Sequence, residues 1–474
     1  MKLALPLSLL LLISGSGAPQ EKTASGALGM VAAEHREGVL AGVRILERGG
    51  NAVDAAVAAA FAMGAAMPSH SGLGGRSQLL VVLKDRAFHI DGGTQVPKSW
   101  TEKEGRLASV CVPGSLAALD LALREGGTMK LAEVMAPALE IAKKKKGPEL
   151  AATLEAVAAG GAKEFYEGKI ADAIAADMAE RGGFVTKEDL AAYRAVKREP
   201  LRGSYRGYEV LTVDRPASGA LVLAALNVLE TFDMTKLSEV DREHALIESL
   251  RIAFEDRKVA VTDSKAHAKK RAAEIDFTKA GTPRVDAEEE GDTTHISVVD
   301  RDGNACAFTQ SLGPWFGAGP AKGLGFYYNA TQGVSGTVAP GARHVTGQSP
   351  TVLRKDGKVA LVLGSAGERR IISAVTQTIH QVVDRGRNLR DAVYAPRWHW
   401  QGPHLVLESS PPDKSLALPA AALDELKKRG FGFGRFMSSP YWGRVQAVLW
   451  DATKKEWIGA ADPRGSGAAA APEK

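Results

Sequence analysis

The sequence predicts an α/β sandwich in which helices cover a largely antiparallel sheet. Short apolar strands occur in pairs joined by tight turns, and these hairpins lie before and after long helical stretches. The chain has 474 residues, of which 45% are hydrophobic and 24% are charged. This is the composition of a globular protein with ample core, built as one large domain or as two or three smaller ones.

The first 18 residues have the pattern of a secretory signal peptide. Lys2 precedes an apolar run at 3–13, and small residues follow at 14–18. The apolar run is too short to span a bilayer, and no cysteine follows it for attachment of a lipid. We therefore predict a signal peptide at 1–18, a periplasmic or secreted product, and no membrane association after its removal.

Two helices and a hairpin are expected next. A helix at 36–48 ends at Gly49-Gly50, and an alanine-rich helix at 51–67 is apolar nearly all round, which predicts burial. The glycine-rich turn at 69–76 resembles a phosphate cradle, but it lacks the lysine and the strand-before-helix order of a P-loop. It leads into a hairpin at 79–90.

The middle of the chain is predicted to be mainly helical. Thr186 has the side chain and the downstream Asp189 of a capped helix start. We expect strands at 109–112 and 205–213, and helical stretches at 115–146, 149–181, 219–232 and 243–259. The polar stretch 264–292, with its acidic run at 286–290, then indicates a flexible, exposed linker.

A threonine pair, Thr293-Thr294, opens the strand that follows this linker. Ile296 and Val298 alternate with polar residues, which is typical of a half-buried strand. Asp302-Gly303 predicts a type I′ turn, whose two central residues both need φ > 0, and a second strand at 305–311 completes the hairpin.

A cut before Thr293 would create a new α-amine beside the hydroxyl of the same residue. Such an amine titrates at roughly pH 7.7–8.0 when unperturbed, and it could serve as the general base for attack by the threonine. The alternative is that the pair merely starts a strand, as β-branched residues often do.

The C-terminal part is predicted to contain a strand at 325–329, a hairpin at 352–363, and a helix at 370–385. A strand–helix–strand portion then ends near Pro463-Arg464, and the alanine-rich tail beyond it is expected to be disordered.

Charge and cysteine usage exclude some classes of function. The net charge is +5 and the cations are dispersed, so no nucleic-acid partner is expected. The run of four lysines at 143–146 suits the C-terminus of a helix, where cations interact favourably with the helix dipole. Cys111 and Cys306 are the two cysteines. Their neighbours resemble buried strands, which favours packed thiols over a disulfide formed after export. No Cys/His cluster has metal-ligand spacing, and no cofactor or metal is expected.

Taken together, these segments resemble the γ-glutamyltransferase family over nearly the whole mature chain. The motifs in the first part are 49–56, 71–75, 112–115, 189–193 and 205–208. Those in the second part are 293–304, 348–351, 364–365, 370–372, 395–397 and 461–464.

The resemblance implies an N-terminal-nucleophile (Ntn) hydrolase fold with four layers, αββα. It also implies a precursor that cuts itself between Asp292 and Thr293, giving a large chain at 19–292 and a small chain at 293–474 that form a heterodimer. Thr293 would be the nucleophile, and Ser311 stands where the family has a supporting threonine hydroxyl. Gly367-Glu368 stands where two glycines supply backbone N–H groups to the oxyanion, and one such donor contributes ~10²–10³ in rate.

The residues with which that family binds the α-carboxylate and the α-amine of a glutamate differ in this chain. Gly93 stands in place of an arginine that binds the α-carboxylate, and Thr346-Gly347 replaces a helping serine pair. The segment 329–334 contains no carboxylate for the α-amine, and Gly313 replaces an asparagine. Burying an unpaired carboxylate or ammonium is costly, so an ordinary γ-glutamyl substrate is expected to bind poorly.

Three charged residues near these motifs have open roles. Arg76 stands where a glycine is usual, and it is either a relocated cation for the substrate or simply exposed. Glu368, if it points into the site, would repel an anionic head group. His295 is either a structural residue of the strand or a general base.

Three functions are compatible with the sequence. The first is an exported, self-processing Ntn amidohydrolase or acyltransferase acting on a small-molecule or peptide amide other than a typical γ-glutamyl compound. The second is a true γ-glutamyltransferase or glutathione hydrolase that binds the charged ends of the glutamate with other residues, such as Arg76 and Arg343. The third is a non-catalytic family member with a binding or structural role.

Overall fold

The computed structural model describes residues 22–102, 104–105, 107–145, 147–258, 264–282, 292–333, 336–408, 410–432 and 442–473. The predicted signal peptide at 1–18 and the acidic part of the predicted linker lie outside these residues. No helix in the described ranges has both the length and the apolar character needed to cross a membrane.

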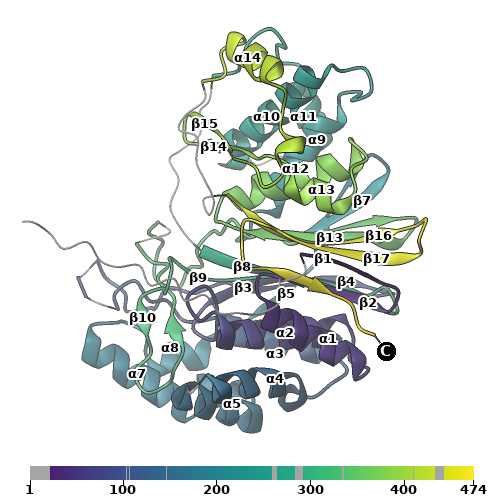
Figure 1. Ribbon diagram of the computed structural model, residues 1–474. Helices are drawn as coiled ribbons and strands as arrows, with labels where there is room; N and C mark the ends of the chain where they lie inside the picture. Colours follow the sequence, from purple (N-terminus) through teal and green to yellow (C-terminus); the bar gives the residue numbers. More distant parts are fainter. Residues whose placement is uncertain are drawn as a thin grey trace, which may run out of the picture.

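Two seven-stranded sheets are stacked face to face between two layers of helices (Figure 1). Every described strand pair within them is antiparallel. This αββα arrangement confirms the predicted α/β sandwich. In the order of its strands, the lower sheet consists of β18 (Ala468–Ala470), β2 (Gly29–Ala33), β8 (Asp292–Asp300), β9 (Ala305–Gly313), β3 (Arg76–Val82), β4 (Ala87–Gly92) and β5 (Val196–Arg198).

The upper sheet and two small ribbons contain the other described strands. In order, the upper sheet consists of β1 (Thr23–Gly26), β17 (Glu456–Ala461), β16 (Arg444–Asp451), β13 (Lys358–Ala366), β12 (Thr351–Lys355), β7 (Tyr208–Thr212) and β6 (Leu201–Tyr205). The ribbons pair β10 (Gly319–Pro320) with β11 (Tyr327–Tyr328), and β14 (Trp398–Gln401) with β15 (His404–Leu407).

The helices divide between the two outer faces (Figure 1). The lower layer contains α1 (Arg36–Glu47), α2 (Ala52–Ala66), α3 (Ser115–Gly126), α4 (Leu131–Lys144), α5 (Pro148–Gly160), α6 (Ala162–Tyr166), α7 (Lys169–Arg181) and α8 (Lys187–Ala192). The upper layer contains α9 (Gly219–Glu230), α10 (Glu239–Glu255), α11 (Ser264–Ala272), α12 (Arg370–Val383), α13 (Leu389–Tyr394) and α14 (Ala420–Lys428). Short 3₁₀ turns lie at Asp256–Lys258 and Lys414–Leu416.

Helix α2 shows how local sequence determines an element. Asn51 and Asp54 form a capping box at its start, and nearly every residue of the helix is buried, as its all-round apolar pattern predicts. It packs with Ile296, Val298 and Phe308 in the core between the lower helices and the lower sheet. This packing fixes the two strands that contain the threonine pair and Ser311.

Strand β8 is more deeply buried than expected. The half-buried prediction is wrong because all residues from Thr293 to Asp300 are buried. The side chains that alternate with Ile296 and Val298 face the upper sheet instead of solvent, and Val299 lies in the apolar cluster between the two sheets. The hairpin to β9 is confirmed, but only Gly303 of its turn has φ > 0, so the turn is not type I′.

Four other expectations are corrected. Residues 109–112 form only an isolated bridge, Gln95↔Val112, and 205–213 is a hairpin rather than one strand. The tail is ordered because β18 pairs with β2 and its alanines are buried. The linker prediction is wrong at its start, because α11 buries Ala268 and Ala272 against Val228 and Ile252.

The prediction of two packed thiols is confirmed. Cys111 and Cys306 are both free and buried.

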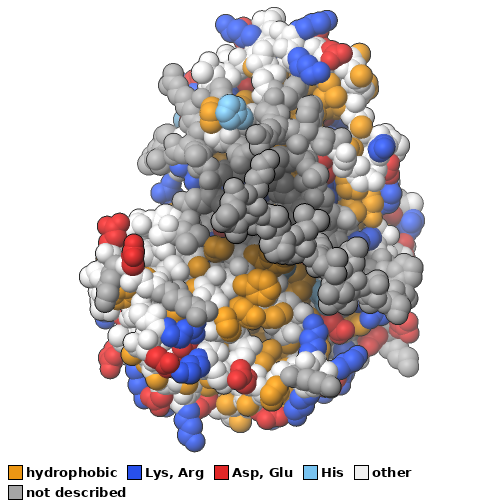
Figure 2. Space-filling model, turned by 60° about the vertical axis from the view of Figure 1, so that its left-hand side comes forward, with side chains coloured by type: hydrophobic (Ala, Val, Ile, Leu, Met, Phe, Trp, Pro, Cys, Tyr) orange, Lys and Arg blue, Asp and Glu red, His pale blue; other side chains and the backbone are white. Residues whose placement is uncertain are grey.

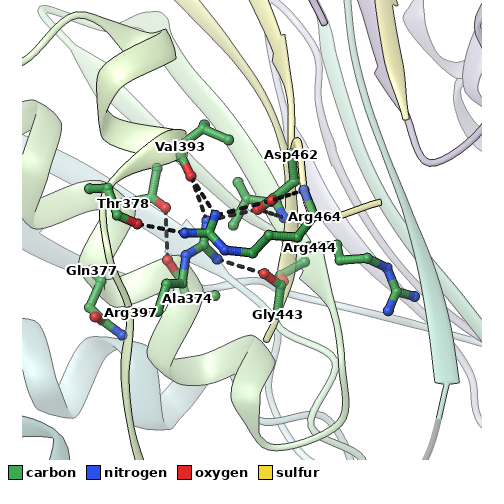
Figure 3. A network of polar contacts seen from close by, with 12 residues as sticks. Ala374, Gln377, Thr378, Val393, Arg397, Gly443, Arg444, Asp462 and Arg464 are labelled. Carbon is green, nitrogen blue, oxygen red and sulfur yellow. Dashed lines mark hydrogen bonds and ion pairs between the residues drawn. The ribbon is translucent and has the colours of Figure 1, made fainter. Parts of the chain in front are cut away.

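A buried ionic network ties the C-terminal strands to α13 and the start of β16 (Figure 3). Asp462 accepts from Arg397 Nη2 at 2.8 Å and from Arg464 Nη1 at 3.1 Å, and Arg464 also pairs with Glu408 at 2.6 Å. Burial would raise the pKa of Asp462, but Arg397 and Arg464 hold this pKa below its usual value. Arg397 Nη1 donates to the carbonyl of Gly443 at 2.8 Å, so the network also fixes the backbone that leads into β16.

Replacement of Asp462 by asparagine is expected to destabilise the protein strongly. Removing one partner from a buried ionic group leaves uncompensated charge, which costs about 3–5 kcal/mol. Urea unfolding of Asp462→Asn would measure the loss, with Asp424→Asn as the control because its partner Lys427 is on the surface. The control is expected to lose less than about 1 kcal/mol. Equal losses in the two variants would contradict a structural role for the network.

Candidate active site

Thr293 lies at the start of β8, where the pairing with β9 is irregular. Asp292 pairs with Gly313 and Thr294 with Gln310, so two residues of β9, Ser311 and Leu312, lie opposite Thr293. A bulge of this kind redirects a side chain and is frequent next to active sites. Thr293 is only 1% exposed.

Thr293, Ser311 and Arg76 lie on one face of three adjacent strands. Arg76 and Ser311 are directly paired in the β3–β9 register. Side chains alternate along a strand, so residues an even number of positions apart share a face. Leu80 lies on the same face as Arg76, Ala307 as Ser311, and Val299 as Thr293. These three apolar residues belong to the cluster between the sheets. The three polar side chains therefore point toward the upper sheet.

Both Ser311 and the backbone of Thr293 are held in place. The Ser311 hydroxyl accepts from the N–H of Gly313 at 2.9 Å. Arg444 of β16 donates to the carbonyl of Thr293 at 3.2 Å and pairs with the buried Glu34 at 2.6 Å. The start of β8 is thus attached to the upper sheet as well as to its own.

The Gly367-Glu368 turn follows β13 and precedes α12. Ala366 pairs in register with Arg444, the residue that reaches the Thr293 carbonyl, so the turn lies at the Thr293 end of β8. Gly367 has φ 119° and Glu368 has φ 51°. A glutamate in the left-handed region is uncommon and costs energy, and such strain concentrates at functional sites.

Two neighbouring segments hold this turn. Gly443, fixed by Arg397, has its Cα 3.2 Å from where a Cβ on Gly367 would lie. A Cβ on Gly347 would collide with the carbonyl of Glu368, so the loop before β12 lies directly on the turn. Thr346 in this loop is fixed by its N–H to the Pro216 carbonyl at 2.8 Å, and its carbonyl accepts from Ser218 Oγ at 2.7 Å.

Arg76 and Glu368 form an ion pair that joins the two sheets. Arg76 Nη2 lies 3.0 Å from Glu368 Oε1, and the side chains are 2% and 12% exposed. Arg76 is therefore not a simple surface residue, and Glu368 is not an uncompensated negative charge. The Nε and Nη1 atoms of Arg76 are buried and have no hydrogen-bond partner among the described residues.

His295 occupies a structural position two residues after Thr293. Its Nδ1 is 2.8 Å from Thr309 Oγ1 and its Nε2 is 3.1 Å from Ser297 Oγ. Burial lowers the pKa of His295 to about 3, so the ring is neutral at working pH. Its ring packs so closely on Gly364 of β13 that a Cβ there would collide with it.

Arg343 is already engaged by another side chain. Its Nη1 lies 2.7 Å from Asp91 Oδ2, and its Cδ would be 3.6 Å from a Cβ on Gly93. Asn329, in the segment aligned with the amine-binding stretch, is bound to the backbone of Gly74 and Cys111. The guanidinium of Arg343 and the amide of Asn329 are thus both engaged within the protein.

An exposed aromatic pair follows the strand that carries Ser311. Trp315 and Phe316 are 65% and 42% exposed and are stacked with their ring centroids 5.6 Å apart. Phe316 has φ 63° and its N–H donates to Ser69, so a strained backbone keeps the ring at the surface. Figure 2 shows hydrophobic side chains gathered in the middle of the lower half of one face.

Sequence reasoning missed Arg444, Glu34 and Gly443. Glu34 is a charged residue directly after the apolar strand β2, which is a weak sign of a buried partner. Nothing local links it to Arg444, which is 410 residues away.

Comparisons with known proteins identify relatives of the whole chain. The family model described as gamma-glutamyltranspeptidase matches residues 38–147 and 143–472. The "Glutathione hydrolase proenzyme" of Escherichia coli K12 is 35% identical, with 79% of this chain and 81% of the relative covered. The "Acylase ACY 1 proenzyme" of Pseudomonas sp. strain SE83 is 33% identical, with 87% and 88% covered.

A solved structure also resembles the whole chain. The cephalosporin acylase from Bacillus halodurans superposes with a TM-score of 0.86 at 26% identity, covering 98% of this chain and 100% of that one. The chain belongs to the gamma-glutamyltranspeptidase family of N-terminal-nucleophile amidohydrolases and acyltransferases.

Proposed function

We propose that this chain is an exported, self-processing threonine amidohydrolase or acyltransferase that acts on an amide other than a typical γ-glutamyl compound. After removal of residues 1–18, the precursor cuts between Asp292 and Thr293. The observation that carries the proposal is the arrangement of Thr293 and Ser311 at the end of the sandwich where the Gly367-Glu368 turn also lies. The names of the relatives as proenzymes support a processing step.

The two products would stay together as a heterodimer. Strands from before the cut pair with strands from after it in both sheets: β2 with β8, β3 with β9, β7 with β12, and β1 with β17. Cleavage at Thr293 removes none of these ladders, so large chain 19–292 and small chain 293–474 remain one folded body.

The reaction follows from the positions of these groups. The α-amine of Thr293 accepts the proton of its own hydroxyl, and Oγ attacks the amide carbonyl. Backbone N–H groups of the Gly367-Glu368 turn stabilise the negative charge that develops on the carbonyl oxygen, and Ser311 supports the nucleophile. The amine leaves with a proton, and water or an acceptor amine then releases the acyl group from Thr293.

The charges around the site favour an uncharged acyl group. Arg76 is paired with Glu368, and Arg343 is paired with Asp91, which also pairs with Arg198 at 3.4 Å. A glutamate head group would therefore have to compete with a carboxylate that already binds each arginine. Thr346, Gly347 and the remaining donors of Arg76 are the groups we assign to substrate binding, through hydrogen bonds to neutral acceptors.

A panel of p-nitroanilides tests this specificity. Pentanoyl-p-nitroanilide has the chain length of a γ-glutamyl group without its charges, and its kcat/KM is expected to be at least about 100-fold higher, since burying unpaired charge costs several kcal/mol. Ser311→Ala is the control, expected to lower both rates together. A tenfold preference for γ-glutamyl-p-nitroanilide would instead support a glutathione hydrolase, the activity named for the E. coli relative. Hydrolysis of neither amide would contradict both functions.

The pH dependence tests the identity of the base. A protonated amine cannot accept the threonine proton, so kcat/KM is expected to fall about tenfold per pH unit below the pKa of the amine. This inflection is expected between about pH 6 and 8, because burial lowers an ordinary value of roughly 7.7–8.0. The pKa of His295, about 3, gives no inflection in that range. A rate that stays constant from pH 5 to 9 would exclude the amine as the base.

A further inference from the structure

A large cavity lies in the upper helix layer beside the candidate active site. Its volume is about 830 Å³, which is within the range of small-molecule sites. It is bounded by α9, α10, α11 and the segments 345–347 and 368–369.

Small and apolar side chains form the helical walls. Ala220, Ala224 and Val228 form a stripe along α9 at intervals of four residues, which places them on one face of the helix. Ile252 of α10 and Ala268 of α11 also line the cavity. The other face of α9, which includes Val222 and Leu226, lies in the core, so this helix is apolar on both sides. Val228, Ile252 and Ala268 already pack on one another, whereas Ala220 and Ala224 are partly exposed, and an apolar ligand would remove this exposed surface from water.

Some of the charged groups that line the cavity form ion pairs. Arg202 pairs with Glu209 at 2.7 Å, and Asp256 with His267 at 2.7 Å. Glu368 pairs with Arg76 on the side of the active site. Four other charged residues, Asp214, Arg215, Arg257 and Arg369, also line the cavity, which thus combines an apolar helical wall with charged groups.

The cavity is continuous with the groups assigned to catalysis. Thr346, Gly347 and Glu368 form part of its wall, and the last of these is in the oxyanion turn. A carbonyl carbon held at this turn has the cavity next to it.

We propose that this cavity is an acyl pocket, which binds the unbranched aliphatic chain of an N-acyl amide while its carbonyl lies at the Gly367-Glu368 turn. The inference rests on the proposed function and names the substrate class: amides of medium-chain fatty acids. Each methylene that enters an apolar pocket increases binding about fourfold.

The test uses the purified two-chain protein and acetyl, butyryl, hexanoyl and octanoyl p-nitroanilides. We expect kcat/KM to rise about threefold to fourfold per methylene and then level off when the pocket is full. Ala224→Phe fills the cavity and is expected to lower the octanoyl-to-acetyl ratio at least tenfold. Ala224→Leu is expected to have an intermediate effect, and Ala152→Phe, on the exposed face of α5, is expected to leave the ratio unchanged.

Other outcomes separate the two proposals. Equal rates along the acyl series, or an unchanged ratio in both Ala224 variants that process normally, would overturn the acyl pocket while leaving the amidase intact. Failure of the wild-type protein to process or to hydrolyse any member of the series would instead contradict the proposed function.

Discussion

The packing of β8 against β13, across the interface between the two sheets, is the constraint on which the site depends. The ring of His295 packs against Gly364, where a Cβ would collide with it, and the neutral ring is hydrogen-bonded to Thr309 and Ser297. This contact fixes the register of one sheet on the other. Thr293, two residues before His295, and Gly367, three residues after Gly364, consequently lie at the same end of the sandwich. Arg444 adds a second tie, because it pairs with Ala366 in its own sheet and donates to Thr293 in the other.

The same interface determines how charge is distributed around the nucleophile. Arg76 and Glu368 come from different sheets and neutralise each other, and Glu368 keeps a strained left-handed backbone while it does so. The carboxylate of a zwitterionic substrate would have to compete with Glu368 for Arg76, and its ammonium group would have to compete with Arg76 for Glu368. An uncharged acyl group meets no such competition, and the cavity lined in part by Glu368 lies next to the turn. The relatives are named as glutathione hydrolases and acylases, so one fold serves more than one acyl group.

Local patterns were sufficient to predict the α2 helix, the β8–β9 hairpin and the capped start of α8, because each depends on residues close in sequence. The threonine pair was recognisable through its motif and its position after a polar segment. Helix α11 was not recognised because it contains three consecutive cations, Lys269 to Arg271, and buries only two alanines. The tail was misjudged because alanine has low β propensity, and its pairing with β2 depends on a strand more than 400 residues away.

The pairing of Arg76 with Glu368 could not be predicted from local sequence patterns either. The two residues are 292 positions apart, and neither has a local partner that would mark it as buried. Sequence alone therefore left Arg76 open between a ligand contact and a surface residue. The structure places Arg76, Ser311 and Thr293 in one row because three strands happen to align, which only the assembled sheet specifies.

The intact mass of the purified protein, measured beside Thr293→Ala and Thr294→Ala, shows whether the chain cuts itself before Thr293. Thr294 is the matched control, because it has the same side chain one position later, on the opposite face of β8. Two chains are expected for the wild type and for Thr294→Ala, the smaller beginning at residue 293 in the wild type, and one uncut chain is expected for Thr293→Ala. A single uncut chain in the wild type, or efficient cutting of Thr293→Ala, would contradict this expectation.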